Sequence, residues 1–304
     1  MPSLPSAFPS LPAVTARLRS AGCVFAEEEA RLLVRAAPAP DDLTALVERR
    51  AAGVPLEHVL GWAGFCGLRI AVDPGVFVPR RRTEFLVRQA VALLRSARRS
   101  VGSAAGARAR PTVVVDLCCG SGAIGVALAA ALGRAEVHAV DIDPAAARCA
   151  LRNVAGVGGR VYEGDLYRPL PAGLRGRVDV LAAGAPYVPT GAIGLLPAEA
   201  RLHEPRVALD GGADGLDVAR RVIAEAPLWL APGGRLMVET SERQAPRAAE
   251  AVARAGLTPA TARSEELDAT VVVGTRPAPA SGHPVSSGSA SSSSPRSRSS
   301  TSDR

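Results

Sequence analysis

Lysine is absent from this chain, so all 36 of its basic side chains are arginine. The formal net charge of +7 therefore rests on one residue type. Together with abundant Ala, Gly and Pro, this composition is typical of GC-rich coding. The positive charge is consequently a weak indication of nucleic-acid binding. A nucleic-acid partner stays open on this ground but is not favoured.

Aromatic residues, paired cysteines and long apolar runs are also scarce. Aromatics make up 3 % of the chain and hydrophobic residues 47 %, so a core must be aliphatic. The five cysteines are odd in number and lack Cys-x-x-Cys spacing. This argues against disulfides and metal sites and favours a cytoplasmic location. No uncharged apolar run reaches about 18 residues and no secretory pattern opens the chain, so we expect no membrane association.

Two patterns precede the main domain. Apolar residues at three- and four-residue spacing predict a small helical domain over residues 1–62, in which Asp41 or Asp42 caps a helix. The alternative is an extension packed on the main domain. Over residues 63–79, apolar residues alternate on both sides of an Asp-Pro-Gly turn at 73–75 and predict a β-hairpin linker.

Residues 80–276 alternate between strand and helix patterns, which predicts an α/β fold with a parallel sheet covered on both faces. A Pro-Gly-Gly turn at 232–234 is expected before the fifth strand, and the last two strands should pair antiparallel at an edge. The Ser- and Arg-rich segment 277–304 is expected to be disordered. The expected strands lie near 112–117, 136–141, 160–163, 177–183, 235–240, 257–262 and 269–275. The expected helices lie near 122–132, 144–154, 214–230 and 244–255.

A glycine-rich turn follows the first of these strands. Three consecutive valines lead into Asp116, and Gly120 and Gly122 then allow a tight turn into a helix whose amide end attracts hydrogen-bond acceptors. Asp141 ends the next strand, where a carboxylate accepts ribose hydroxyls. Asp116 would meet an ammonium group, which favours S-adenosylmethionine (AdoMet) over a nicotinamide cofactor. A dehydrogenase, or a turn that only packs helix on strand, is the alternative.

Two later stretches also follow strands. Asp165 is placed to accept the exocyclic amine of an adenine, with Leu166 against the ring; a turn or cap residue is the alternative. The sequence Gly-Ala-Pro-Tyr at 184–187 is similar to the Asn/Asp-Pro-Pro-Tyr motif of methyltransferases that act on planar nitrogens. Such nitrogens are poor nucleophiles, so acceptors must grip their N–H groups while an aromatic ring stacks on the planar group.

The order of six segments resembles the glutamine-N5 methyltransferases of peptide-chain release factors. They include Pro-Arg-x-x-Thr-Glu at 79–84 and Glu-Pro-Arg-Val-Ala-Leu at 204–209. The resemblance implies a Rossmann-like class I AdoMet-dependent methyltransferase domain, here 80–276, and an N-terminal helical domain that docks a protein substrate. It implies a cofactor site of Thr83, Asp116, Cys118, Gly120, Gly122, Asp141, Asp165 and Leu166. It implies a catalytic site of Gly184, Ala185, Pro186 and Tyr187.

Two positions depart from the family pattern. Cys118-Cys119 replaces a Gly-Thr pair, and Gly184 replaces the motif Asn, which removes one of two amide acceptors. Losing one positioned hydrogen-bond partner costs about a hundredfold in rate. The only Asn of the chain, Asn153, lies on a predicted helix. A slow enzyme, an enzyme acting on another nitrogen such as that of a nucleic-acid base, and a non-catalytic AdoMet-binding module all remain open.

Overall fold

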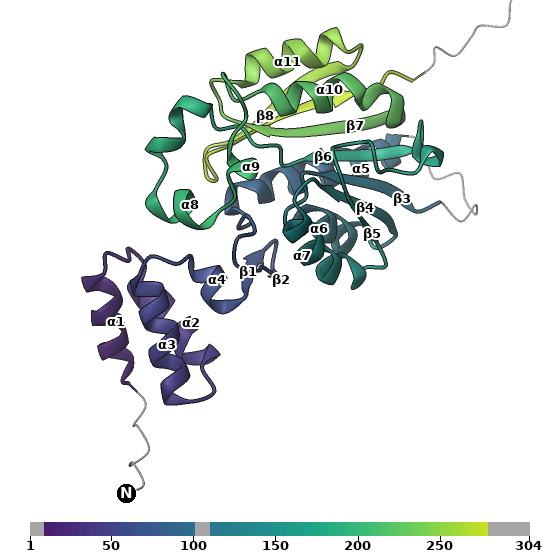
Figure 1. Ribbon diagram of the computed structural model, residues 1–304. Coiled ribbons are helices and arrows are strands. Elements are labelled where there is room, and N and C mark those ends of the chain that lie inside the picture. Colours follow the sequence, from purple (N-terminus) through teal and green to yellow (C-terminus); the bar gives the residue numbers. More distant parts are fainter. Residues whose placement is uncertain (1–8, 101–109, 279–304) are drawn as a thin grey trace, which may run out of the picture.

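The computed structural model describes residues 9–100 and 110–278. The predicted disorder of the tail therefore falls outside the described residues beyond residue 278. Within the described part, a seven-stranded sheet is flanked by helices, and a group of N-terminal helices lies to one side of it (Figure 1).

The sheet has the strand order β5-β4-β3-β6-β7-β9-β8. Strands β3 to β7 are parallel, β9 pairs antiparallel with β7, and β8 pairs antiparallel with β9 at the edge. Both the α/β class and the antiparallel edge pair are thus confirmed. The strands are β3 (Thr112–Leu117), β4 (Ala135–Asp141), β5 (Arg160–Glu163), β6 (Val178–Ala183), β7 (Leu230–Thr240), β8 (Thr258–Ser264) and β9 (Ala269–Thr275).

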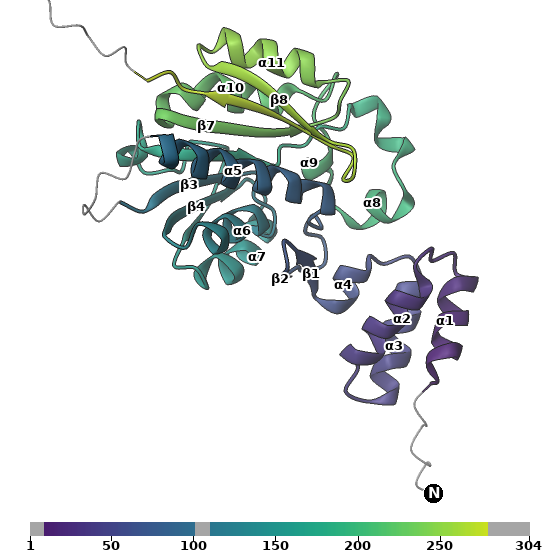
Figure 2. The same cartoon turned by 180° about the vertical axis from the view of Figure 1, so that it is seen from behind.

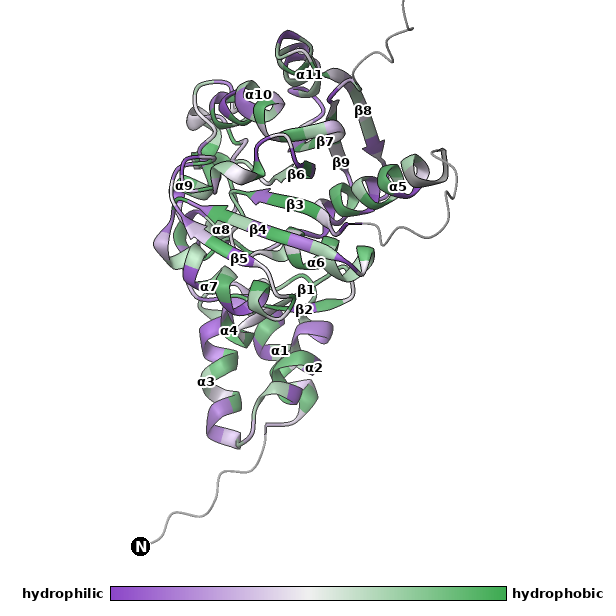
Figure 3. Ribbon diagram, turned by 90° about the vertical axis from the view of Figure 1, so that its right-hand side faces the viewer, coloured by the Kyte–Doolittle hydropathy of each residue, from purple (hydrophilic) through white to green (hydrophobic). Residues whose placement is uncertain are grey.

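Helices cover both faces of the sheet, as Figures 1 and 2 show from opposite sides. One face packs against α5 (Glu84–Ser100), α6 (Ala123–Leu132) and α7 (Pro144–Ala155). The other packs against α10 (Asp217–Trp229) and α11 (Ala245–Arg254). Every residue of β3 is buried, and the middle of the sheet is hydrophobic in Figure 3. The expectation of an aliphatic core is confirmed.

The N-terminal helices are α1 (Leu11–Ser20), α2 (Ala26–Ala36), α3 (Pro40–Ala51) and α4 (Leu56–Leu60). They enclose an aliphatic core of their own around Leu18, Leu33 and Leu43. The predicted cap is wrong, because α3 begins at Pro40, so Asp41 and Asp42 lie in its first turn. Their charges there still favour the positive end of the helix dipole.

The hairpin lies earlier than predicted. Strand β1 (Trp62–Phe65) pairs with β2 (Leu68–Ala71) across a turn at Cys66 and Gly67, both with positive φ. The Asp-Pro-Gly turn forms, with Val76 N donating to Asp73 O, but 76–78 makes no strand. The alternating valines are buried against α7 instead, so packing explains the pattern without strand pairing.

The Pro-Gly-Gly sequence at 232–234 does not precede the fifth strand but lies inside β7. Val178 is the partner of Leu230 and Val180 that of Arg235, so the extra residues form a bulge. A Cβ on Gly234 would lie 2.6 Å from Val178 O. Glycine is therefore required there by the close approach of β6, which is why a turn-like sequence lies within a strand.

Short elements after β6 extend over the carboxyl end of the sheet (Figure 1). They are the 3-10 helix η3 (Thr190–Leu195) and the helices α8 (Ala198–His203) and α9 (Arg206–Leu209). Two further 3-10 helices are η1 (Arg81–Thr83), just before α5, and η2 (Ala172–Leu174), before β6. The segment from α8 to α9 covers the edge of the sheet at which the parallel strands end.

Candidate active site

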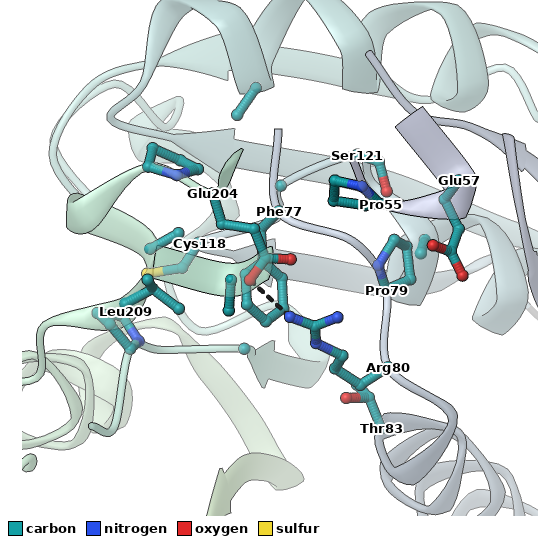
Figure 4. Close-up of a pocket in the computed structure, with 18 of the residues that line it drawn as sticks. Pro55, Glu57, Phe77, Pro79, Arg80, Thr83, Cys118, Ser121, Glu204 and Leu209 are labelled. Atoms are coloured by element: carbon teal, nitrogen blue, oxygen red, sulfur yellow. Dashed lines mark hydrogen bonds and ion pairs between the residues drawn. The ribbon is translucent and has the colours of Figure 1, made fainter. Parts of the chain in front are cut away.

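A cavity of about 1300 Å³ lies at the carboxyl ends of the parallel strands. The chain runs outward from β3 to β5 on one side and from β6 to β7 on the other, so β3 and β6 flank the topological switch point where α/β proteins bind ligands. Figure 4 shows part of the lining, with side chains from several elements pointing into the cavity. Of the predicted site residues, those that line it are Thr83, Cys118, Gly120, Asp141, Asp165, Leu166, Gly184, Ala185, Pro186 and Tyr187.

Asp141 braces the glycine turn. Its Oδ2 accepts a hydrogen bond from Gly120 N at 2.8 Å and its Oδ1 accepts one from Asp143 N at 2.9 Å. Each carboxylate oxygen keeps lone pairs free for a further donor. Burial raises the pKa of Asp141, and the two backbone bonds oppose that effect. The carboxylate can therefore shape the turn and accept ribose hydroxyls together.

Asp116 and Gly122 lie behind the turn and do not line the cavity. Asp116 is fully buried; its Oδ2 accepts from Gly125 N at 2.8 Å, and its Oδ1 has no partner within the described chain. Burial raises the pKa of Asp116 to about 8. A Cβ on Gly122 would lie 2.8 Å from Val154 Cγ2, so this glycine lets the turn pack on α7. Both residues therefore support the glycine turn from behind rather than lining the cavity.

Asp165 lies on the same edge, paired with arginine. Its Oδ2 lies 2.6 Å from Nη2 of Arg221 and 3.5 Å from Nη1 of Arg168. The hydrogen bond from Arg221 holds the pKa of this carboxyl below its ordinary value. Asp165 is thus an ionised acceptor, as the predicted adenine contact requires, and the buried Leu166 follows it at φ +50°.

The Gly-Ala-Pro-Tyr sequence begins directly after β6. Tyr187 is fixed at both ends: its hydroxyl donates to Glu239 Oε1 at 3.4 Å, and its carbonyl accepts from Gln244 Nε2 at 2.8 Å. Burial raises the pKa of Tyr187 to about 12, so the phenol stays protonated. One contact holds the hydroxyl end of the ring and the other holds the backbone, so Tyr187 is fixed where it lines the cavity, as a stacking platform must be.

Asn153 does not replace the missing Asn. Its Oδ1 accepts from Ala71 N at 2.9 Å, and its Nδ2 donates to Ala71 O and, at 2.8 Å, to Ser121 O. All its hydrogen-bonding groups tie β2 to the glycine turn. The role of Asn153 is therefore structural, and it does not supply the hydrogen-bond acceptor that Gly184 lacks.

Two buried glutamates were missed as site residues by the sequence reasoning. Glu204 accepts from Val78 N at 3.1 Å and pairs with Arg80 at 2.5 Å, an ion pair drawn in Figure 4. Arg80 in turn lies over the Phe77 ring, with 4.8 Å to its centroid. Glu204 and Arg80 both lie in the sequence segments that carry the family resemblance. Glu239, at the end of β7, carried no sequence signal.

Comparison with known proteins decides the family. Residues 114–193 match the family model described as Methyltransferase domain. The chain is 43 % identical over 211 residues to the release factor glutamine methyltransferase of Geobacter sulfurreducens, covering 68 % of each chain. It is 37 % identical over 275 residues to that of Mycolicibacterium smegmatis, covering 84 % of this chain and 92 % of the relative.

The chain belongs to the release factor glutamine methyltransferase family. A relative with a different printed name is the 4-amino-L-phenylalanine/4-methylamino-L-phenylalanine methyltransferase of Streptomyces pristinaespiralis, 38 % identical over 209 residues and covering 69 % of this chain and 68 % of the relative. Among solved structures, the hMettl16 catalytic domain in complex with MAT2A 3′UTR hairpin 6 has a TM-score of 0.50 at 13 % identity, covering 76 % and 81 % of the two chains. At that identity the likeness shows the fold alone, a class I methyltransferase sheet.

AdoMet is the methyl donor of this methyltransferase, and the residues present fit it. The cavity exceeds the 300–1,000 Å³ usual for a small-molecule site, which leaves room for a cofactor and part of a substrate. The acceptors Asp141 and Asp165 suit ribose and adenine. Bound AdoMet supplies a methyl group on an electrophilic sulfonium; the protein supplies position and electrostatics.

Cys118 is strained where the family has glycine. Its φ of +54° falls in the left-handed region, which costs an L-residue about 1–2 kcal/mol. We expect Cys118→Gly to raise the Tm by about 2–4 °C in thermal denaturation, roughly 1 kcal/mol. Gly120→Ala is the matched control, since it adds a Cβ at φ +55° with only Phe77 O nearby, at 3.9 Å, and should lower the Tm. A lower Tm for Cys118→Gly would mean that the sulfur packing outweighs the strain.

Proposed function

We propose that this chain transfers a methyl group from AdoMet to a glutamine side-chain amide nitrogen of a peptide-chain release factor. The observation that carries the proposal is the placement of Ala185 and the fixed ring of Tyr187 directly after β6, in the same cavity as the glycine turn. The names of the relatives supply the acceptor protein.

The chemistry needs orientation more than proton transfer. An amide nitrogen shares its lone pair with the carbonyl and attacks a methyl group poorly. The Ala185 carbonyl can accept one amide N–H, and the Tyr187 ring can stack on the planar group, so that the nitrogen faces the cofactor end of the cavity. No base has to act before transfer, because the nitrogen becomes acidic only once it is methylated.

The N-terminal helices support a protein substrate. Val24 and Phe25 line the cavity and are 84 % and 67 % exposed, so large apolar side chains stand at its mouth. Leu202 of α8 is 72 % exposed, and Glu199 and Ala200 of the same helix line the cavity. Exposed apolar side chains around a cavity mark an interaction surface. We infer that residues 1–62 dock the substrate protein, with 63–79 as linker and 80–276 as catalytic domain.

Intact-protein mass spectrometry tests the proposal. Release factor incubated with this protein and AdoMet should gain one methyl group. A release factor whose Gly-Gly-Gln glutamine is changed to Ala should gain none. No gain in the wild-type release factor, together with tight AdoMet binding by calorimetry, would favour a non-catalytic binding module and remove the proposed activity.

A second candidate is N-methylation of a small aromatic amine. It is favoured by the loss of the motif acceptor at Gly184, which an arylamine nitrogen needs less than an amide nitrogen does, and by the name of the Streptomyces pristinaespiralis relative. An arylamine nitrogen, which is bonded to the ring and not to a carbonyl, would rely on Tyr187 stacking more than on two acceptors. Methylation of 4-aminophenylalanine with no methylation of release factor would select this candidate.

Other substrate classes are less supported. The relatives named above do not favour a nucleic-acid base as the methyl acceptor. Binding to RNA or DNA that weakens steeply with added salt would be the evidence for such a substrate.

Among the helices of the described residues, none has the length and apolar character of a membrane span. All five cysteines are free thiols, which supports the proposal of a cytoplasmic setting.

A further inference from the structure

Glu239 is the β7 neighbour of Gly184, the position at which the family motif has asparagine. Strands β6 and β7 run parallel, with Ala182 opposite Met237 and Ala183 opposite Val238. One further step along both strands places Gly184 beside Glu239. Neighbouring residues of a parallel pair project to the same face of a sheet. The Glu239 side chain therefore occupies the face on which a side chain at 184 would lie, and both positions line the cavity.

The carboxyl group of Glu239 is only half satisfied. Its Oε1 accepts from the Tyr187 hydroxyl at 3.4 Å, and the Thr83 hydroxyl also interacts with the carboxyl group and lowers its pKa. Its Oε2 is shielded and makes no hydrogen bond of ordinary geometry within the described residues. The whole residue is 5 % exposed. A buried polar atom without a partner costs about 1–3 kcal/mol, and more when it is charged. Such a group at a cavity wall calls for a hydrogen-bond donor that arrives with a ligand.

We propose that Glu239 is the second acceptor for the substrate N–H groups and takes the role that Gly184 cannot fill. The Ala185 carbonyl would accept one N–H and Glu239 Oε2 the other, so the nitrogen would be gripped on both sides. A charged acceptor makes a stronger hydrogen bond than the amide oxygen it would replace. The inference rests on the proposed function, because it concerns the same methyl acceptor.

A purely structural role makes a different prediction. Glu239 also holds the Tyr187 hydroxyl, so its removal could act by releasing the ring. In Glu239→Gln the amide oxygen can keep Tyr187, which leaves an NH2 group facing the substrate where an acceptor was. Tyr187→Phe removes the same hydroxyl contact and leaves the carboxylate. The two variants thus distinguish a Glu239 that binds the substrate N–H group from a Glu239 that only fixes the Tyr187 ring.

Four variants in a cycle test the inference: wild type, Glu239→Gln, Gly184→Asn and the double variant. A Cβ at 184 would lie 3.6 Å from Cys118 O and Ile124 Cδ1, which are ordinary contacts, so the backbone admits a side chain at this position. We expect Glu239→Gln to lower kcat at least about tenfold, with AdoMet affinity unchanged. Gly184→Asn should raise the rate of the Glu239→Gln background about tenfold, a larger gain than it gives in the wild type. Gly184→Ala, which adds bulk without an acceptor, should not restore it.

The pH profile gives a second readout. Burial raises the pKa of Glu239, while Thr83, Arg82, Tyr187 and Arg80 act in the opposite direction. Because the acceptor is the carboxylate, the wild-type rate should fall on the acid side at a pH above that of an ordinary glutamate. Glu239→Gln should lack this limb.

The inference would be overturned if Gly184→Asn raised the rate equally in the wild-type and Glu239→Gln backgrounds. It would also be overturned if Tyr187→Phe lowered the rate as much as Glu239→Gln does. If the wild type methylates 4-aminophenylalanine but no release factor, the proposed function fails while the same cycle, run on the arylamine, still tests Glu239. No transfer to either acceptor would overturn both.

Discussion

Asp141→Ala should weaken AdoMet binding by at least about a hundredfold. The carboxylate shapes the glycine turn through Gly120 N and, in the proposed cofactor site, would accept the ribose hydroxyls with its free lone pairs. Hydrogen bonds to charged groups contribute about 1.5–3 kcal/mol each, and 1.4 kcal/mol is tenfold in affinity. Loss of two or more such bonds therefore exceeds a factor of a hundred. Isothermal calorimetry with AdoMet measures the effect directly.

Asp141→Asn is the matched control for this result. Asn keeps one acceptor oxygen and the shape of the side chain but presents an NH2 group to one backbone N–H. Its affinity should fall between those of the wild type and Asp141→Ala. Thermal denaturation without ligand should show that both variants remain folded. An affinity within threefold of the wild type in Asp141→Ala would show that the cofactor does not lie at the end of β4.

Tyr187→Ala should lower the rate of methyl transfer by about a hundredfold while leaving AdoMet affinity nearly unchanged. The ring follows Ala185 by two residues; Glu239 holds its hydroxyl, and Gln244 holds the backbone carbonyl of Tyr187. Without it the acceptor amide can tilt away from the methyl group, and a misplacement of about 1 Å costs about a hundredfold. Single-turnover rates with saturating AdoMet separate this effect from cofactor binding.

Tyr187→Phe serves as the control, because it keeps the ring and removes only the hydroxyl. Its rate should stay within about fivefold of the wild type. If Phe and Ala lower the rate equally, the hydroxyl rather than the ring would be the important group. If neither lowers it, Tyr187 does not contact the methyl acceptor.

Local patterns in the sequence were sufficient for most of the catalytic fold. The valines of β3 are buried on both faces, so their run predicted a central parallel strand at its true bounds. The spacing from Gly122 to Asp141 brought the ends of two neighbouring strands to one edge. The edge pair β8 and β9 followed from a connection too short for a crossover helix.

The remaining errors have one physical source, since contacts distant in sequence override local preference. The Pro-Gly-Gly sequence reads as a turn, yet it bulges within β7 because Gly234 must lie against β6. The valines of 76–78 alternate like a strand but pack on α7. Asp116 was expected at the ligand and lies behind the turn. Glu239 became visible only through the register of β6 and β7.

The two departures from the family pattern have different consequences. Cys118 accepts a left-handed conformation at a cost in stability but leaves the turn in place. Gly184 removes an acceptor from the substrate side, where chemistry depends on orientation. The structure offers a replacement in the neighbouring strand, so a glycine at 184 is compatible with an active enzyme.

Tandem mass spectrometry of release factor after incubation with methyl-deuterated AdoMet tests the central claim most directly. The account predicts the labelled methyl group on the side-chain nitrogen of the Gly-Gly-Gln glutamine, formed by the wild-type protein and greatly slowed by Tyr187→Ala. A label on another residue, or none on release factor under conditions in which AdoMet is bound, would contradict it.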